Sequence, residues 1–273
     1  MTPRPVAEEF DLDLASGRVH AQRFGPTDAP LLLAVHGLSA NMHGFDYLAP
    51  QLVADGGRQV VALDLRGRGG SESTAPGSYG LDSHARDILS AATVLGHERF
   101  DWVGWSLGAL IGIVAAGLEP GRIRRLGLID HAGRSDERAI AAVIAGLDRL
   151  DLHIPDVDQY VARVQAGSPI RPFTDFWRRF YAYEFGRTAK AACLEDIGDT
   201  AGRDWPTAWR HLTMPVALVR CLRPLNGGLV VPDDVAADIA STAPDVTVVD
   251  VDADHFTVMT HEPAAQALRA LVS

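Results

Sequence analysis

The sequence predicts an α/β protein built on a mostly parallel sheet of eight strands with helices on both faces. Short runs of aliphatic residues, typical of strands buried on both faces, alternate with segments of helical periodicity. This alternation runs to about residue 131 and resumes after residue 213. Strands that alternate with helices imply crossover connections, and these give a mostly parallel sheet. The 273 residues are enough for one such domain with a sizeable core.

The first elements are predicted from their patterns in chain order. Glu9–Leu14 and Arg18–Phe24 alternate apolar and polar residues around Ser16-Gly17, which predicts a β-hairpin at a sheet edge. Continuous apolar runs then predict buried strands at 31–35, 60–63, 100–103 and 126–129. The stretches between them predict helices at 45–54, 81–96 and 109–117.

From about Ala132 to Thr213 the strand–helix alternation stops. Helical periodicity covers 139–150, 157–165 and 176–185, and aromatic residues are dense. We therefore expect residues 132–213 to form a helical cap on a core made of residues 1–131 and 214–273. The core resumes with predicted strands at 216–219 and 246–251, and with helices after Pro232 and at 263–272.

Composition and charge exclude several classes of function. The formal net charge is 25 − 35 = −10, from 25 lysine and arginine residues and 35 aspartate and glutamate residues. This charge disfavours nucleic acid or an anionic membrane as a partner. No stretch reaches the roughly 18 apolar residues of a membrane span, and Met1–Glu9 is polar, unlike a signal peptide. We expect a cytoplasmic monomer or homodimer. Cys193 and Cys221 lack C-x-x-C spacing and favour buried free thiols, with a disulfide between them left open.

Gly104-Trp105-Ser106-Leu107-Gly108 is the strongest local signal. It reads G-x-S-x-G, with a predicted strand before it and a predicted helix after it. On such a strand-to-helix turn the serine hydroxyl projects clear of the backbone, and the flanking glycines allow the tight turn without a side-chain clash. The motif therefore predicts a nucleophilic serine at Ser106.

Other motifs follow in a characteristic order. His36-Gly37 follows the predicted strand 31–35, residues 64–71 read D-x-R-G-x-G-x-S, and Asp254-His255-Phe256 follows the last predicted strand. With the serine motif and the helical insertion, this order resembles the α/β-hydrolase family over nearly the whole chain. The resemblance implies the α/β-hydrolase fold and a serine hydrolase that uses a catalytic triad.

The resemblance implies a role for each site residue. Ser106 would be the nucleophile, and His255 the base that takes its proton. The backbone N–H groups of Leu38 and Leu107 would form the oxyanion hole. Their side chains can be apolar, because only the amides are needed there. His36 would brace the Leu38 loop.

The acid of the triad departs from the usual pattern. In most of the family it follows the strand here predicted at 216–219, but residues 220–226 contain no carboxylate. Some members carry the acid one strand earlier, where Asp130 stands, 130 − 106 = 24 residues after the serine. Asp130 is therefore the first candidate. The remaining candidates are Asp233, Asp234, Asp252 and Asp254.

These residues predict a serine hydrolase that cleaves a carboxylic ester or lactone of a small to medium, largely apolar molecule through an acyl-enzyme. Hydrolysis of a C–C or amide bond, or a perhydrolase reaction, would use the same triad. A non-catalytic small-molecule receptor is the alternative from another class. No H-E-x-x-H, P-loop or G-x-G-x-x-G motif occurs, so we expect no metal and no cofactor. The five arginines Arg163, Arg171, Arg178, Arg179 and Arg187 predict a solvated face, with one of them a candidate contact for a substrate carboxylate.

Overall fold

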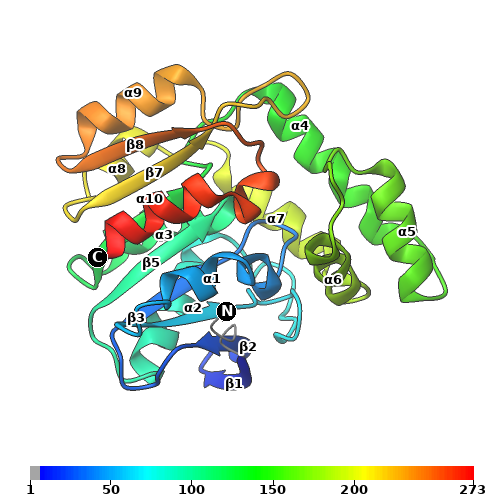
Figure 1. The fold of residues 1–273 in the computed structure, drawn as a ribbon, viewed down its shortest axis with the longest axis horizontal. Coiled ribbons are helices and arrows are strands. Elements are labelled where there is room, and N and C mark those ends of the chain that lie inside the picture. Colours follow the sequence, from blue (N-terminus) through cyan, green and yellow to red (C-terminus); the bar gives the residue numbers. More distant parts are fainter. Residues whose placement is uncertain (1–6) are drawn as a thin grey trace.

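The computed structural model describes residues 7–273 and contains an eight-stranded sheet with the order β1-β2-β4-β3-β5-β6-β7-β8 (Figure 1). Strand β2 is antiparallel to both of its neighbours, and all other pairs are parallel. Residues 1–6, the start of the polar N-terminal segment, lie outside the described residues. The strands are β1 (Glu8–Leu14), β2 (Gly17–Phe24), β3 (Leu31–Val35), β4 (Gln59–Leu63), β5 (Phe100–Trp105), β6 (Ile123–Ile129), β7 (Val216–Cys221) and β8 (Val246–Val251).

Helices follow most of the parallel strands. The α-helices are α1 (Leu48–Leu52), α2 (Leu81–Val94), α3 (Leu107–Leu118), α4 (Glu137–Gly146), α5 (Val157–Gly167), α6 (Asp175–Glu184), α7 (Lys190–Thr200), α8 (Trp205–Trp209), α9 (Asp233–Thr242) and α10 (Glu262–Val272). Three 3₁₀ segments cover Met42–Phe45, Leu147–Asp151 and Thr257–Thr260.

The sheet separates two apolar cores, as the continuous strand runs predicted. Successive side chains of a strand point to opposite faces. In β3, Leu31, Leu33 and Val35 join the core on the side of α2, α3, α8 and α9, whereas Leu32 and Ala34 join the core on the side of α1 and α10. All five residues of β3 are buried. The mostly parallel eight-stranded sheet with helices on both faces is therefore confirmed.

Two parts of the helical prediction differ from the structure. The single helix expected at 45–54 is a 3₁₀ turn, Met42–Phe45, followed by the five-residue helix α1. Helices α7 and α8 were not predicted. In α7 the buried side chains include the carboxylate of Asp196, which breaks the apolar stripe that marks an amphipathic helix, and α8 is only one turn long. Cys193 and Cys221 are buried free thiols.

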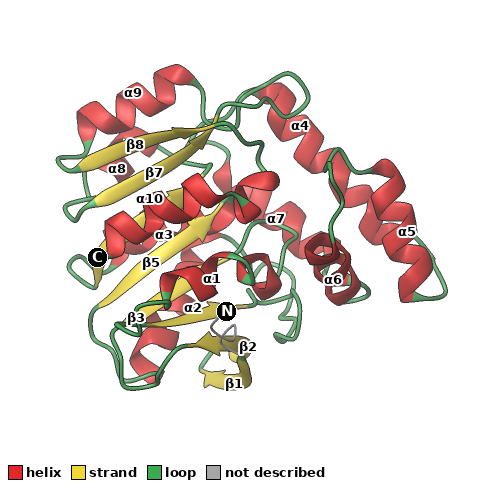
Figure 2. Cartoon of the chain, viewed as in Figure 1, coloured by secondary structure: helices red, strands yellow, loops and turns green. Residues whose placement is uncertain are grey.

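The segment between β6 and β7 divides into two parts. Helices α4, α5 and α6 lie beyond the carboxyl ends of the parallel strands (Figure 2). Helix α7 contacts α2, and α8 contacts α3 and α9, so both pack on the sheet layers. Polar contacts join α6 to the core: Tyr183 donates to Asp64 at 2.8 Å, and the Asn41 amide donates to the Phe180 carbonyl at 3.2 Å. Within residues 7–273 no helix is long and apolar enough to span a bilayer.

Two glycines allow α3 to approach the sheet. A Cβ on Gly108 would lie 2.0 Å from the carbonyl oxygen of Val35 in β3, and one on Gly104 would lie 2.1 Å from the Gly108 carbonyl oxygen. Both values are far below any tolerable contact, and the atoms they would meet belong to the backbone. The close packing of β5, α3 and β3 therefore requires glycine at both positions.

We predict that Gly108→Ala lowers the free energy of unfolding by about 3 kcal/mol or more, because the new methyl group pushes the backbone of α3 away from that of β3. Urea unfolding measures this. Gly117→Ala in the same helix is the matched control, since its Cβ would meet nothing closer than 3.4 Å, and alanine is the better helix former. Equal stability of the two variants would contradict the packing argument.

Candidate active site

Ser106 lies on the turn between β5 and α3 in a conformation that L-residues rarely adopt, with φ 54° and ψ −116°. Its N–H donates to the Ile129 carbonyl at 2.9 Å, which fixes the turn against the end of β6. A strained backbone of this kind costs of order 1–3 kcal/mol and persists only where the surroundings enforce it. Here the two close-packed glycines and the β6 contact enforce it, and the hydroxyl projects from the turn.

The three residues expected to act together are joined by hydrogen bonds. The Ser106 hydroxyl lies 3.0 Å from Nε2 of His255, and Nδ1 of His255 lies 2.8 Å from Oδ2 of Asp130. A carboxylate only accepts, so Nδ1 carries the proton and Nε2 is free to accept from the serine. All three residues are less than 9% exposed. The arrangement can remove a proton from Ser106 and hold the resulting imidazolium beside a carboxylate.

The position of Asp130 is set by the neighbouring strand end. Asp130 follows β6 with φ 48°, its N–H donates to the Val219 carbonyl at 2.8 Å, and its Oδ1 accepts the Cys221 N–H at 2.9 Å. Residues of β7 thus orient the carboxylate, although no acid follows β7 itself.

The other candidate acids make different contacts, and none is hydrogen-bonded to His255 within residues 7–273. Asp254 accepts the backbone N–H groups of Phe256 and Thr257, both at 2.9 Å. The remaining pairs are Asp233 with Arg220, Asp234 with Arg134 and Asp252 with Arg223.

The Leu38 loop lies against Ser106, since a Cβ on Gly37 would lie 3.1 Å from the serine Cβ. His36 braces this loop: its Nδ1 donates to the Gly37 carbonyl at 2.7 Å, and its Nε2 accepts the Leu65 N–H at 2.9 Å. The Gly37 carbonyl belongs to the same peptide group as the Leu38 N–H, so His36 orients that amide. Burial lowers the pKa of His36 to about 3, and the ring is neutral.

Neither of the two amides expected to form the oxyanion hole donates to a backbone acceptor among the described residues. The Leu38 N–H donates to no residue that the structure describes. Leu107 is the first residue of α3, where the N–H groups have no acceptor within the helix. The positive end of the helix dipole adds to the effect for Leu107.

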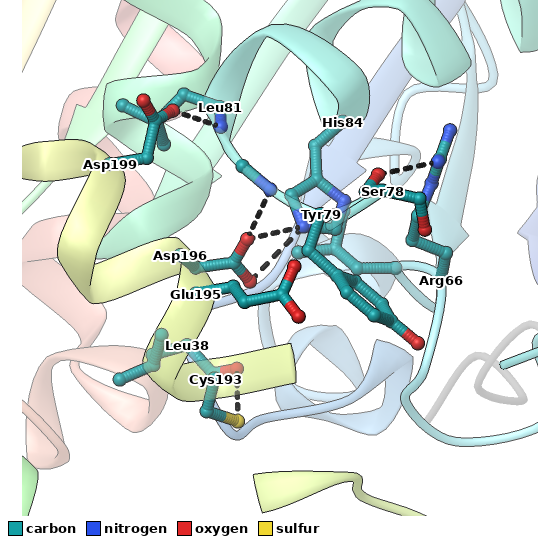
Figure 3. A network of polar contacts seen from close by, with 12 residues as sticks. Leu38, Arg66, Ser78, Tyr79, Leu81, His84, Cys193, Glu195, Asp196 and Asp199 are labelled. Carbon is teal, nitrogen blue, oxygen red and sulfur yellow. Dashed lines mark hydrogen bonds and ion pairs between the residues drawn. The ribbon is translucent and has the colours of Figure 1, made fainter. Parts of the chain in front are cut away.

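A buried ionic cluster holds the Leu38 carbonyl from the other side. Arg68 Nε donates to this oxygen at 3.0 Å, and the Cys193 thiol lies 3.5 Å from it. Arg68 is ion-paired with Asp196 of α7. Asp196 also accepts from His84 at 3.0 Å, and Figure 3 shows this contact together with the one between the Cys193 thiol and the Leu38 carbonyl. The side chains of Arg68, Asp196 and His84 are 0% exposed. The sequence alone does not indicate this cluster, because Arg68 occupies a variable position of D-x-R-G-x-G-x-S.

A cavity of about 930 Å³ opens above Ser106 and His255. Its walls are largely apolar, and α4, α5 and α6 supply much of them. Apolar residues that line it include Leu38, Trp105, Val143, Val164, Phe180 and Phe256. Arg149 and Ser39 also line it and were not predicted, because no motif surrounds either residue. Within residues 7–273 no group of three or more His, Cys, Asp or Glu side chains is arranged to hold a metal ion.

Comparison with known proteins identifies a matching family and several relatives. Residues 30–262 match the family described as alpha/beta hydrolase fold. The chain is 29% identical over 203 residues to the 3-hydroxybutyrate-oligomer hydrolase of Cupriavidus necator, a match that covers 74% of this chain but only 56% of that protein. It is 29% identical over 260 residues to the magnesium-chelatase 30 kDa subunit of Rhodobacter capsulatus, covering 91% of this chain and 87% of that one.

Among solved structures, the crystal structure of E-2-(acetamidomethylene)succinate hydrolase matches with a TM-score of 0.82. The match covers 98% of this chain and 99% of that one at 24% sequence identity. At this identity the likeness concerns the fold.

Buried histidines with lowered pKa values, among them His36 and His131, make stability depend on pH. His131 directly follows Asp130. Its pKa is lowered to about 3, mainly by burial and to a lesser extent by the charge of His255. Unfolded histidine has a pKa near 6.5, so below that pH the unfolded state binds protons that the folded state does not. We predict that the free energy of unfolding falls between pH 6.5 and 3, by at most about 1.4 kcal/mol per pH unit for each of His36 and His131.

Urea unfolding at pH 7, 6 and 5 measures this slope. His131→Gln removes one of these groups and reduces the slope. His153→Gln, at an exposed position, controls for the loss of a histidine. An unchanged slope in His131→Gln would contradict the assignment.

Proposed function

The chain belongs to the alpha/beta hydrolase family, and from this premise we propose that it is a serine hydrolase that cleaves a carboxylic ester or lactone through an acyl-enzyme. The observation that carries the proposal is the continuous hydrogen-bonded series from Ser106 through His255 to Asp130, with distances of 3.0 and 2.8 Å. A serine hydroxyl is a weak nucleophile until a base takes its proton, and His255 is in contact with it.

In the proposed reaction the Ser106 oxygen attacks the substrate carbonyl carbon while Nε2 of His255 takes its proton. The carbonyl oxygen becomes negatively charged and is stabilised by the N–H groups of Leu38 and Leu107. The imidazolium then gives its proton to the alcohol as the ester bond breaks. Water, deprotonated by the same histidine, releases the acid from the enzyme. Asp130 keeps the histidine in the required tautomer and stabilises its positive charge.

The form of the cavity supports a small-molecule substrate with apolar parts. We propose that residues 132–213 act as a cap in which α4, α5 and α6 supply the walls of the 930 Å³ space. One relative is named a hydrolase of 3-hydroxybutyrate oligomers, whose units are joined by ester bonds. This name supports a carboxylic ester, and hydrolysis of an amide or C–C bond and a perhydrolase reaction are the alternatives on the same triad. A non-catalytic receptor was favoured only by the missing acid after β7, and Asp130 contacts His255 in its place.

We predict that Ser106→Ala lowers kcat/KM for short p-nitrophenyl esters by about 10³-fold or more, because the nucleophile is lost. Release of p-nitrophenol measures this, and Ser241→Ala on the exposed side of α9 is the matched control. Labelling of the wild-type protein by a fluorophosphonate, absent in Ser106→Ala, gives an independent readout. Residual activity above about a tenth of wild type would rule out Ser106 as the nucleophile.

We predict that Asp130→Asn lowers kcat by roughly 10³- to 10⁴-fold with little loss of folding stability. The asparagine oxygen can still accept the Cys221 N–H, but its NH₂ group faces Nδ1 and favours the wrong tautomer of His255. Asp252→Asn and Asp233→Asn are matched controls at the alternative acids. If Asp130→Asn retains activity and either Asp252→Asn or Asp233→Asn loses it, Asp130 is not the catalytic acid.

A further inference from the structure

We propose that the cavity contains a carboxylate-binding subsite made by Ser39, Arg149 and Tyr181, and that the ester cleaved at Ser106 carries a free carboxylate a few carbons from the scissile carbonyl. This inference rests on the proposed serine-hydrolase function and specifies its substrate class. All three residues line the same cavity as Ser106 and His255.

Arg149 is held firmly but its donors are not all used. It lies in the 3₁₀ segment Leu147–Asp151, and its side chain is 19% exposed. Its guanidinium forms a two-point ion pair with Glu184, in which Nε lies 3.0 Å from Oε2. Nη2 also donates to the Ser39 hydroxyl at 2.8 Å, and Nη1 donates to the Gly146 carbonyl. A guanidinium has five N–H donors, and the fifth, on Nη1, has no acceptor among the described residues.

The acceptor that balances Arg149 lies behind it, outside the cavity lining. Glu184 is 0% exposed and does not line the cavity. It also accepts from the Tyr160 hydroxyl at 2.6 Å. Glu184, itself held by Tyr160, therefore fixes the guanidinium, and Arg149 lines the cavity with one Nη1 donor left free.

Two hydroxyl groups of residues that line the cavity have no acceptor among the described residues. The Ser39 oxygen accepts from Arg149, and no described residue accepts its proton. Tyr181 is 6% exposed, its ring lies 5.7 Å from the Arg149 Cζ, and its hydroxyl has no partner within residues 7–273. Burial raises the pKa of Tyr181 to about 12, so this hydroxyl keeps its proton.

Such a set of donors selects the chemistry of the bound group. These donors belong to residues that line a largely apolar cavity, where a substrate group that accepts hydrogen bonds would satisfy them. A carboxylate only accepts, offers about four acceptor positions, and complements the guanidinium charge. Arg163 of α5 lines the same cavity and has no ion-pair partner among the described residues. Asp148 also lines the cavity, and its carboxylate is ion-paired with Lys190.

The distance to Ser106 limits the length of the substrate. Gly37 packs directly on Ser106, and Ser39 is two residues further along the chain. Two residues span at most about 7 Å. A carboxylate at Ser39 therefore lies within a few carbons of a carbonyl at Ser106, a length that the half-esters of succinic and glutaric acid can span.

The test compares monoethyl glutarate with its neutral isostere, in which a primary amide replaces the carboxylate. Ethanol release gives kcat/KM for each at pH 7. We expect wild type to favour the half-ester by about tenfold or more, the effect of a charge-assisted hydrogen bond. Ser39→Ala and Tyr181→Phe, which remove only a hydroxyl, each lower this ratio about five- to tenfold. Arg149→Lys keeps the charge, loses the planar fork, and also lowers the ratio.

Ser241→Ala and Tyr47→Phe, which make the same substitutions away from the cavity, are matched controls and leave the ratio unchanged. A wild-type ratio near one, or a ratio that Ser39→Ala and Tyr181→Phe do not alter, overturns the carboxylate subsite while the proposed function stands. Where turnover of both esters is too slow to measure, they are compared as competitors of fluorophosphonate labelling. Equal protection then overturns the subsite, and absence of labelling overturns the proposed function together with it.

Discussion

The buried hydrogen bond between His255 and Asp130 is the interaction on which the arrangement of the site depends. It joins the segment after β8 to the end of β6, and the Cys221 N–H of β7 holds the other oxygen of the same carboxylate. Three adjacent strand ends thus meet at one carboxyl group. A buried carboxylate is tolerated only where such partners are present, so the register of β6, β7 and β8 and the geometry around Ser106 support each other.

Much of the fold follows from the sequence because burial on both faces leaves a recognisable pattern. β3 is apolar at all five positions for this reason, and the G-x-S-x-G motif is readable because Gly104 and Gly108 face backbone atoms that exclude any side chain. The carboxylate that contacts His255 was harder to predict. Sequence places Asp130 at a strand end, but which strand end faces His255 depends on the order of strands in the sheet, and nothing local in the sequence records that order.

Residues whose partners lie far along the chain were missed. Arg149 meets Glu184 across 35 residues, and Arg68 meets Asp196 across 128. Each looks like an ordinary surface charge in the sequence, since charged residues are mostly exposed. Only the folded chain shows that both pairs lie beside the Leu38 loop, one at Ser39 and one at the Leu38 carbonyl. Asp196 is also the reason that α7 was not predicted, because a carboxylate on the buried face interrupts the apolar stripe of the helix.

The ion pair between Arg68 and Asp196 has a consequence for engineering. Removing one member of a fully buried pair leaves an uncompensated charge and costs about 3–5 kcal/mol. The segment between β6 and β7 is therefore not an interchangeable module: a chimera that imports this segment from a relative must import a matching residue at position 68 as well. The same holds for the contacts of α6, where Tyr183 needs the carboxylate of Asp64. A chimera that exchanges both residues of each pair together would preserve these contacts and the Leu38 loop beside Ser106.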